Sequence, residues 1–267
     1  MKIVCIIQAR ISSTRLPAKI LLPGYNKPLL FHLIDRINKC KQINKVVVAT
    51  SKNSLDDLLY DLCLSKKINV FRGSLDDLLD RYFKCAKKFK ADHIVRITSD
   101  CPLIDPKIID SVIKKYLSVK NLDYMSNIHP PSYPDGFDVE IFSFKALRKA
   151  HVTAKNNFER EHVTPYIWDN LDKFKIKNYS NLKNKNLYEN YRLTLDYKED
   201  FFVIWKIFQK LYPKKKNFNL KDIISFLKRN PKIMKNNHLI KVNWYKNYYK
   251  KLKTINKRDV RTKVINV

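Results

Sequence analysis

Short apolar runs alternate with amphipathic stretches through the first 143 residues, and this alternation limits the fold more than any other feature. The runs are rich in valine and isoleucine, which is typical of strands buried on both faces of a sheet. We expect such strands at residues 2–8, 45–50, 69–71 and 93–98. Helices are expected at residues 28–39 and after three capping signals, Ser54 with Asp57, Ser74 with Asp77, and Asp105 followed by Pro106.

This order of strands and helices predicts a parallel sheet with helices on both faces. Ligands of such sheets bind at the carboxyl ends of the strands. The strand ends are residues 8–10, 50–51, 72–73 and 99–100. Beyond residue 120 the pattern is looser, and we expect strands at 124–127, 138–142 and 191–195 and helices at 157–168, 199–211 and 220–227.

The net charge of +29, from 54 basic and 25 acidic residues among 267, is an expected footprint of nucleic-acid binding. Lysines outnumber arginines 42 to 12, however, and the codons of an AT-rich genome would produce the same bias. Residues 201–267 hold 19 basic and 2 acidic residues. We therefore expect a basic C-terminal face and no nucleic-acid partner.

Other sequence features favour a soluble, cytoplasmic protein. No apolar run approaches the roughly 18 residues of a membrane span, and the N-terminus lacks a signal-peptide pattern. The five cysteines are odd in number and form no C-x-x-C pair, which argues against a disulfide framework or a zinc knuckle.

The segment after the first expected strand carries the clearest chemical signal. Residues 8–19 place Arg10, Arg15 and Lys19 around three hydroxyl side chains. Cations, hydroxyls and backbone amides at a strand end suit a polyphosphate, because each donates to phosphate oxygens. Neither the P-loop nor the dinucleotide glycine pattern is present. The alternative is a polar surface loop in a lysine-rich protein.

Six motifs follow one another along residues 2–240: Gln8–Lys19, Phe71–Tyr82, Arg96–Asp105, Asp135–Glu140, Glu159–Pro165 and Arg192–Asp196. The series resembles the cytidylyltransferases that make CMP-activated sugar acids, and more closely their spore-coat-polysaccharide branch. The resemblance implies an α/β fold with a single mixed, mostly parallel sheet sandwiched by helices, a Rossmann-like nucleotidyltransferase fold akin to glycosyltransferase type A.

The activity implied by the resemblance is transfer of CMP from CTP to a sugar, a nonulosonic or related sugar acid, for surface polysaccharide biosynthesis. Pyrophosphate is released and Mg²⁺ is required, and the chain could form a homodimer. Three alternatives stay open: a phosphorylated or phosphonate acceptor, a glycosyltransferase that uses a finished sugar nucleotide, and a protein that binds polyanions or membrane surfaces through its basic C-terminus.

Two aspartates are expected to bind the metal. Asp100 and Asp196 each follow an expected strand, so their carboxylates could share one magnesium ion. The resemblance assigns the same positions to metal, and Arg10 and Lys19 complete the expected catalytic set. The alternatives are a turn or helix cap at Asp100 and a helix cap at Asp196.

The resemblance places the triphosphate against Arg10 and Lys19 and the cytosine against the backbone that begins at Gln8. Asp77 and Arg81 lie four residues apart on an expected helix, so an ion pair between them is the alternative to nucleotide contact. The expected nucleotide-binding set is Gln8, Ala9, Arg10, Ser13, Arg15, Lys19, Asp77, Arg81 and Asp100.

The expected acceptor-binding residues are Asp135, Gly136, Asp138, Glu140, Glu161, His162 and Arg192. Gly136 is one of only three glycines, which indicates a positive φ or a close approach. Asp138 and Glu140 share one face of an expected strand and could bond sugar hydroxyls, or form a solvated face. A helical histidine such as His162 is often a structural hydrogen bonder. Apart from Arg192 and Arg160, no basic pattern suits the carboxylate of a sugar acid.

Two residues depart from the family pattern. Ala18 and Asn26 stand where the family usually has glycine. We expect a backbone at residue 18 that alanine can adopt, and a left-handed turn at Asn26.

The resemblance divides the chain into a nucleotidyltransferase domain at residues 1–240 and a basic aromatic tail at 241–267. The tail carries Trp244, Tyr245, Tyr248 and Tyr249. We expect these aromatic residues to pack against the body of the protein or against a second subunit.

Overall fold

The computed structural model describes residues 1–180, 187–237 and 248–255. Its centre is a seven-stranded sheet in the order β3-β2-β1-β4-β6-β5-β7. β6 runs antiparallel to both of its neighbours, and the other neighbouring pairs are parallel, which confirms the expected mixed sheet. The strands are β1 (Ile3–Gln8), β2 (Lys45–Ser51), β3 (Val70–Gly73), β4 (His93–Thr98), β5 (Tyr124–Ser126), β6 (Glu140–Ser143) and β7 (Ile176–Asn178).

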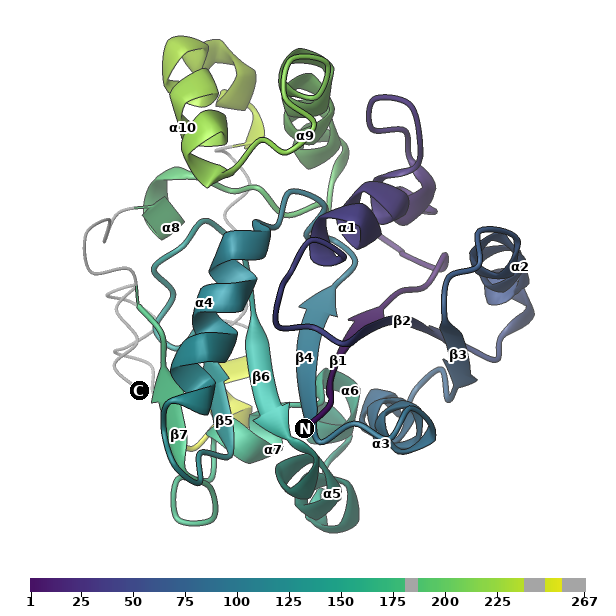
Figure 1. Cartoon of the computed structure of the whole chain (residues 1–267), viewed down its shortest axis with the longest axis vertical. Coiled ribbons are helices and arrows are strands. Elements are labelled where there is room, and N and C mark those ends of the chain that lie inside the picture. Colours follow the sequence, from purple (N-terminus) through teal and green to yellow (C-terminus); the bar gives the residue numbers. More distant parts are fainter. Residues whose placement is uncertain (181–186, 238–247, 256–267) are drawn as a thin grey trace.

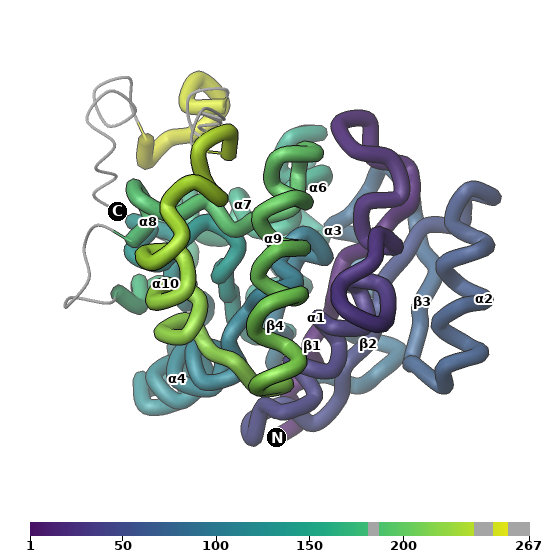
Figure 2. The backbone as a smooth tube through the Cα atoms, turned by 90° about the horizontal axis from the view of Figure 1, so that it is seen from above, coloured from purple at the N-terminus to yellow at the C-terminus, as the bar shows by residue number. Residues whose placement is uncertain are grey.

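Helices lie on both faces of the sheet (Figure 1). One face is covered by α1 (Leu29–Ile37), α4 (Pro106–Leu117), α9 (Lys198–Leu211) and α10 (Leu220–Arg229). The other face is covered by α3 (Leu78–Lys88), α5 (Phe144–Thr153), α6 (Asn157–His162) and α7 (Pro165–Trp168). Two further helices are α2 (Asp57–Ser65) and α8 (Leu187–Asn190). Seen from above, α9 lies between α10 and α1 (Figure 2).

The alternation of side chains along β1 divides the core into two clusters. Ile3, Cys5 and Ile7 pack under α1 and α4, whereas Val4 and Ile6 pack against α3. All five are almost completely buried, so each face of the strand removes apolar surface from water. The prediction from the valine and isoleucine runs, that the strands are buried on both faces of the sheet, is therefore confirmed for β1.

Two expected elements beyond residue 120 are wrong. Residues 191–195 form no strand but a single parallel bridge between Arg192 and Asp135, because the partner segment turns at once through a hydrogen bond from Phe137 N to Pro134 O. The helix expected at 157–168 is two helices, α6 and α7. Pro165 lacks an N–H group, so it begins a new helix at its first position.

Helix caps also differ in part from the expected ones. Asn53, and not Ser54, caps a short 3₁₀ turn that precedes α2, because its side chain accepts a hydrogen bond from Leu55 N. Asp77, and not Ser74, is the N-cap of α3, where its carboxylate accepts from Asp80 N. Asp105 caps α4 as expected, with Pro106 at the first helical position.

Ala18 and Asn26 behave differently from each other. Ala18 has φ 52°, a left-handed conformation that glycine adopts without strain and alanine adopts at a cost of roughly 1–2 kcal/mol. Asn26 is absent from the described residues with positive φ, so the expectation of a left-handed turn there is wrong. The turn instead closes through hydrogen bonding of Gly24 N to Lys27 O.

The described part of the C-terminal segment packs against α6 and α7. Tyr248 lies 5.0 Å from Phe158 between ring centroids, and Leu252 and Ile255 are buried. The carboxylate of Asp169 accepts hydrogen bonds from Lys253 N, Thr254 N and Thr254 Oγ1 at 2.7 Å each. These contacts attach residues 248–255 to the body of the protein.

Trp244, Tyr245 and the expected domain boundary at residue 240 lie outside the described residues. None of the helices in residues 1–180, 187–237 and 248–255 combines the length and the apolar character that crossing a bilayer requires.

We expect Asp169→Asn to release the C-terminal segment, because the amide offers one acceptor oxygen in place of two charged ones. Trypsin should then cleave after Lys251 and Lys253 faster than in the wild type. Asp172→Asn, an exposed change in the same loop, is the control. Equal cleavage rates for wild type and Asp169→Asn would show that the carboxylate does not hold the segment.

Candidate active site

A pocket of about 610 Å³ opens at the carboxyl ends of β1 and β4 and the start of β6. Because β6 is antiparallel to β4, its first residue lies at the same edge of the sheet as the last residues of the parallel strands. The predicted residues that line the pocket are Gln8, Ala9, Arg10, Ser13, Arg15, Lys19, Arg81, Asp100, Asp135, Asp138, Glu140, Glu161, His162, Arg192 and Asp196. A second hollow of about 880 Å³, beside α1, contains none of them.

Lys19 joins the two aspartates that were predicted to bind metal. Its Nζ lies 2.9 Å from Asp196 Oδ1 and 3.5 Å from Asp100 Oδ2, and it donates to Leu195 O at 2.7 Å. Burial alone would lower the pKa of Lys19, but the two carboxylates raise it. Likewise burial opposes the charged form of Asp100, while Lys19 and a hydrogen bond from Thr98 lower its pKa. One cation thus lies between the carboxylates of Asp100 and Asp196.

Asp196 also contacts two arginines. Arg15 Nη2 donates to Asp196 Oδ1 at 2.6 Å, and Arg192 Nη2 donates to Asp196 Oδ2 at 3.2 Å. The Arg15 side chain is 44% exposed, whereas that of Arg192 is 10% exposed. The Asp196 carboxylate is therefore surrounded by three cations, of which Arg15 is the most accessible to solvent.

Asp200 holds this arrangement and was missed by the sequence reasoning. Its buried carboxylate accepts hydrogen bonds from Arg192 and from the backbone N–H groups of Asp196 and Tyr197. Asn237 donates to it as well. A local sequence signal could have indicated Asp200. This residue lies three positions after Tyr197, the N-cap of α9, and its carboxylate accepts from Tyr197 N as in a capping box.

Gly136 positions the segment that precedes Asp196. It has φ +97°, and an added Cβ would lie 2.5 Å from the backbone of Leu193. The expectation of a positive φ is confirmed, and the close approach is to the protein's own backbone. Leu193 N also donates to Asp135 O, and Leu195 N donates to Asp100 O.

The end of the pocket beside the loop after β1 holds two arginines without partners among the described residues. Arg10 is exposed, and Arg81 is 4% exposed with Nε and Nη1 lacking any acceptor. Burial and the charge of Arg10 lower the pKa of Arg81. A buried guanidinium without acceptors is costly, so this group favours an anionic or acceptor-rich ligand.

Asp77 does not pair with Arg81. Its carboxylate accepts from Arg160 Nε at 2.8 Å and from Arg160 Nη2 at 2.6 Å, so the alternative of an i,i+4 ion pair with Arg81 is wrong. Asp77 and Gly136 are the two predicted site residues that do not line the pocket. Arg160 further donates to the carbonyl oxygens of His151 and Ala154.

The opposite end of the pocket, where β6 begins, is rich in carboxylates. Arg192 Nη1 donates to Asp135 Oδ2 at 2.8 Å, and burial raises the pKa of Asp135 to about 6 although Arg192 opposes the shift. Burial and neighbouring carboxylates raise the pKa of Asp138 as well. Glu140 is 2% exposed and accepts from Tyr124, Thr164 and Arg96.

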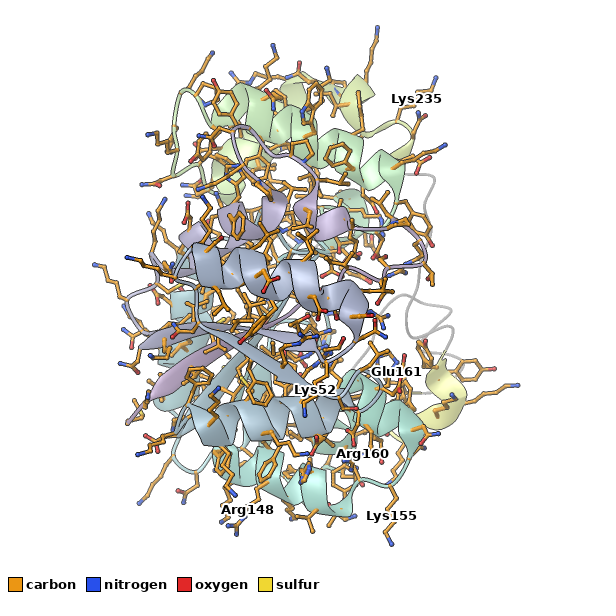
Figure 3. All side chains as sticks on the ribbon, turned by 90° about the vertical axis from the view of Figure 1, so that its right-hand side faces the viewer. Lys52, Arg148, Lys155, Arg160, Glu161 and Lys235 are labelled. Carbon is orange, nitrogen blue, oxygen red and sulfur yellow. The ribbon has the colours of Figure 1, made fainter. Side chains whose placement is uncertain are left out.

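Glu161 and His162 are the last two residues of α6, and Glu161 lies beside the C-terminal segment (Figure 3). The His162 ring lies 5.1 Å from that of Tyr248, which also lines the pocket. Burial and the charges of Arg96 and Lys251 lower the pKa of His162 to about 4, so its ring is neutral at pH 7. Tyr248 was predicted to pack against the body of the protein or a second subunit, and its place in the pocket was not predicted.

Hydrogen bonds to buried and half-buried side chains hold the loop after β1 in place. Asp56 is completely buried and accepts hydrogen bonds from Ile11 N at 2.7 Å and from Ser51. The Gln8 side chain accepts from Arg96 and Tyr82. Ser13 Oγ accepts from Leu16 N at 3.4 Å. These contacts fix the backbone from which Arg10, Arg15 and Lys19 project.

Two carboxylates converge here, but no group of three or more histidine, cysteine or acidic residues within the described ranges could hold a metal ion by itself. Mg²⁺ commonly binds one or two carboxylates together with substrate phosphates and water. The ammonium of Lys19 lies where both carboxylates point, so the donor set fits a cation shared with a phosphate ligand.

We expect Asp200→Asn to lower the free energy of unfolding by about 1–3 kcal/mol, because a neutral amide weakens the hydrogen bonds from Arg192 and from two backbone N–H groups, while Asp135 and Asp196 still pair with Arg192. Urea denaturation of the variant and of Glu199→Gln, a half-buried neighbour without a recorded ion pair, measures the difference. A loss in Asp200→Asn no larger than in Glu199→Gln would contradict the structural role of the carboxylate.

Comparison with known proteins agrees with this geometry. The cytidylyltransferase family model matches residues 4–212. An uncharacterised protein of Methanocaldococcus jannaschii is 39% identical over 246 residues, which cover 92% of this chain and 98% of the relative. The spore coat polysaccharide biosynthesis protein SpsF of Bacillus subtilis is 32% identical, with 86% and 95% covered.

A solved structure has the same fold over nearly its whole length. The cytidylyltransferase of Leptospira borgpetersenii superposes with a TM-score of 0.82 at 37% identity and covers 88% of this chain and 98% of its own. Since both the family model and full-length relatives match, the chain belongs to the cytidylyltransferase family.

Proposed function

We propose that this chain transfers CMP from CTP to a hydroxyl group of a sugar and releases pyrophosphate, with Mg²⁺ bound by Asp100 and Asp196. The observation that carries the proposal is the convergence of these two carboxylates on the ammonium group of Lys19. In the same pocket, Arg10 and Arg81 have donors without partners among the described residues. This combination suits a triphosphate with a metal ion and an aromatic base.

In-line displacement at phosphorus builds negative charge on the nonbridging and leaving oxygens, so the enzyme acts by positioning and electrostatics. Arg10, Arg15 and Lys19 belong to one loop and would bind the triphosphate. Mg²⁺ between the two carboxylates would neutralise further charge on the transferred phosphoryl group. Asp100 has a lowered pKa, so it stays ionised at neutral pH and keeps its affinity for a cation.

The acceptor we propose is a surface-polysaccharide sugar, in the first instance a nonulosonic or related sugar acid. The relative named for spore coat polysaccharide biosynthesis supports the pathway class. The resemblance of the six sequence motifs to cytidylyltransferases that make CMP-activated sugar acids supports a sugar acid as the acceptor.

A specific observation favours a second candidate, an acceptor without a carboxylate. The two arginines predicted for that carboxylate are both engaged: Arg192 pairs with Asp135, Asp196 and Asp200, and Arg160 pairs with Asp77. A sugar acid would have to compete with these protein carboxylates or bind its carboxylate to the metal.

Thermal stabilisation by nucleotides tests the nucleotide site. We expect CTP with Mg²⁺ to raise the melting temperature more than UTP, ATP, GTP or a UDP-sugar does. In Asp100→Ala the magnesium-dependent part of the CTP shift should disappear, while the part without Mg²⁺ remains. Preference for a UDP-sugar would favour a glycosyltransferase, and no shift with any nucleotide would overturn the proposal.

Pyrophosphate release tests the acceptor. CTP and Mg²⁺ are supplied with a nonulosonic acid, with the same sugar after reduction of its carboxylate to an alcohol, and with a phosphonate. Faster release with the acid supports the sugar-acid acceptor, and faster release with the reduced sugar supports the second candidate. Release with the phosphonate alone would contradict both. Reactions without acceptor correct for hydrolysis of CTP.

A further inference from the structure

We propose that Arg15 and Lys19 occupy the metal-binding oxygen of Asp196 until a triphosphate draws them away, so that nucleotide binding creates the metal site. The inference rests on the proposed function and concerns the order in which the site assembles. It starts from one atom. Asp196 Oδ1 accepts from Arg15 Nη2 at 2.6 Å and from Lys19 Nζ at 2.9 Å.

These two contacts saturate the oxygen that a cation would need. A divalent ion binds a carboxylate oxygen at about 2.0–2.1 Å, and two positive groups already stand within hydrogen-bond distance of Oδ1. The other oxygen, Oδ2, accepts from Arg192. A metal ion entering alone would therefore face repulsion from three cations and would have to displace at least one of them.

A triphosphate changes this balance because it offers the same cations stronger acceptors. Arginine binds phosphate oxygens in a bidentate manner, and lysine binds them as a point charge. Both residues lie on the loop after β1, and the Arg15 side chain is 44% exposed, so it can turn toward the pocket without disturbing the core. Arg192 stays behind, since Asp135 and Asp200 also hold it.

Free Asp196 would then meet Asp100 across the position that the Lys19 ammonium has left. Each ligand in this scheme raises the affinity of the protein for the other, because coupling between two binding sites is reciprocal. The cations thus keep the carboxylates of Asp100 and Asp196 from repelling each other before the substrate arrives.

Titration of the nucleotide-free protein with Mn²⁺, followed by electron paramagnetic resonance, tests this inference without turnover. We expect Arg15→Ala to bind Mn²⁺ about tenfold more tightly than the wild type, a factor that corresponds to about 1.4 kcal/mol. Arg10→Ala is the matched control: it removes the same charge from the same loop but makes no recorded contact with Asp196, so its Mn²⁺ affinity should stay close to that of the wild type.

Adding Asp196→Asn to Arg15→Ala should abolish the gain, which locates the ion at that carboxylate. Unchanged Mn²⁺ affinity in Arg15→Ala, an equal gain in Arg10→Ala, or a gain that survives Asp196→Asn would overturn the inference. Circular dichroism checks that each variant is folded. Because no nucleotide is present, failure here differs from failure of the CTP experiment above.

Discussion

The buried carboxylate of Asp200 is the interaction on which the rest of the site depends. It neutralises Arg192 and at the same time binds the backbone N–H groups of Asp196 and Tyr197. Arg192 in turn reaches Asp135 on the other side of the pocket. A buried pair of this kind is costly to break, since removal of one partner leaves an uncompensated charge. These contacts therefore fix the position of residues 192–200 relative to the segment that holds Asp135.

The sheet supplies the other half of the site. β1 and β4 run parallel, so Gln8 and Asp100 emerge at one edge, and the reversed β6 brings Glu140 to that edge by its first residue. Seven separate segments of the chain thus surround one pocket. The direction of the strands brings these segments to one edge of the sheet. The buried ion pairs then fix which side chains contact one another there.

The first 120 residues could be predicted well because each buried strand is a continuous apolar run that depends little on its neighbours. In the later half β5, β6, α9 and α10 agree with the expected elements, but segments whose structure depends on partners far away in sequence do not. Residues 191–195 look like a strand, yet the turn at Pro134–Phe137 limits them to one bridge. The site was predicted residue by residue from motif resemblance, but the pairing of Arg160 with Asp77, 83 positions apart, has no local signal. Tyr248 reaches the pocket only because Asp169 holds the chain after it.

The reversed direction of β6 has a consequence for how such enzymes diversify. The end of the pocket beside Arg10 and Arg81 is made from loops that leave the parallel strands, while much of the carboxylate-rich end is made from the segment that leads into β6 and from α6. Insertions or substitutions between residues 127 and 139 can reshape one end without altering the register of β1 against β4. One scaffold can thus change the carboxylate-rich end of its pocket during evolution while the end beside the loop after β1 is inherited unchanged.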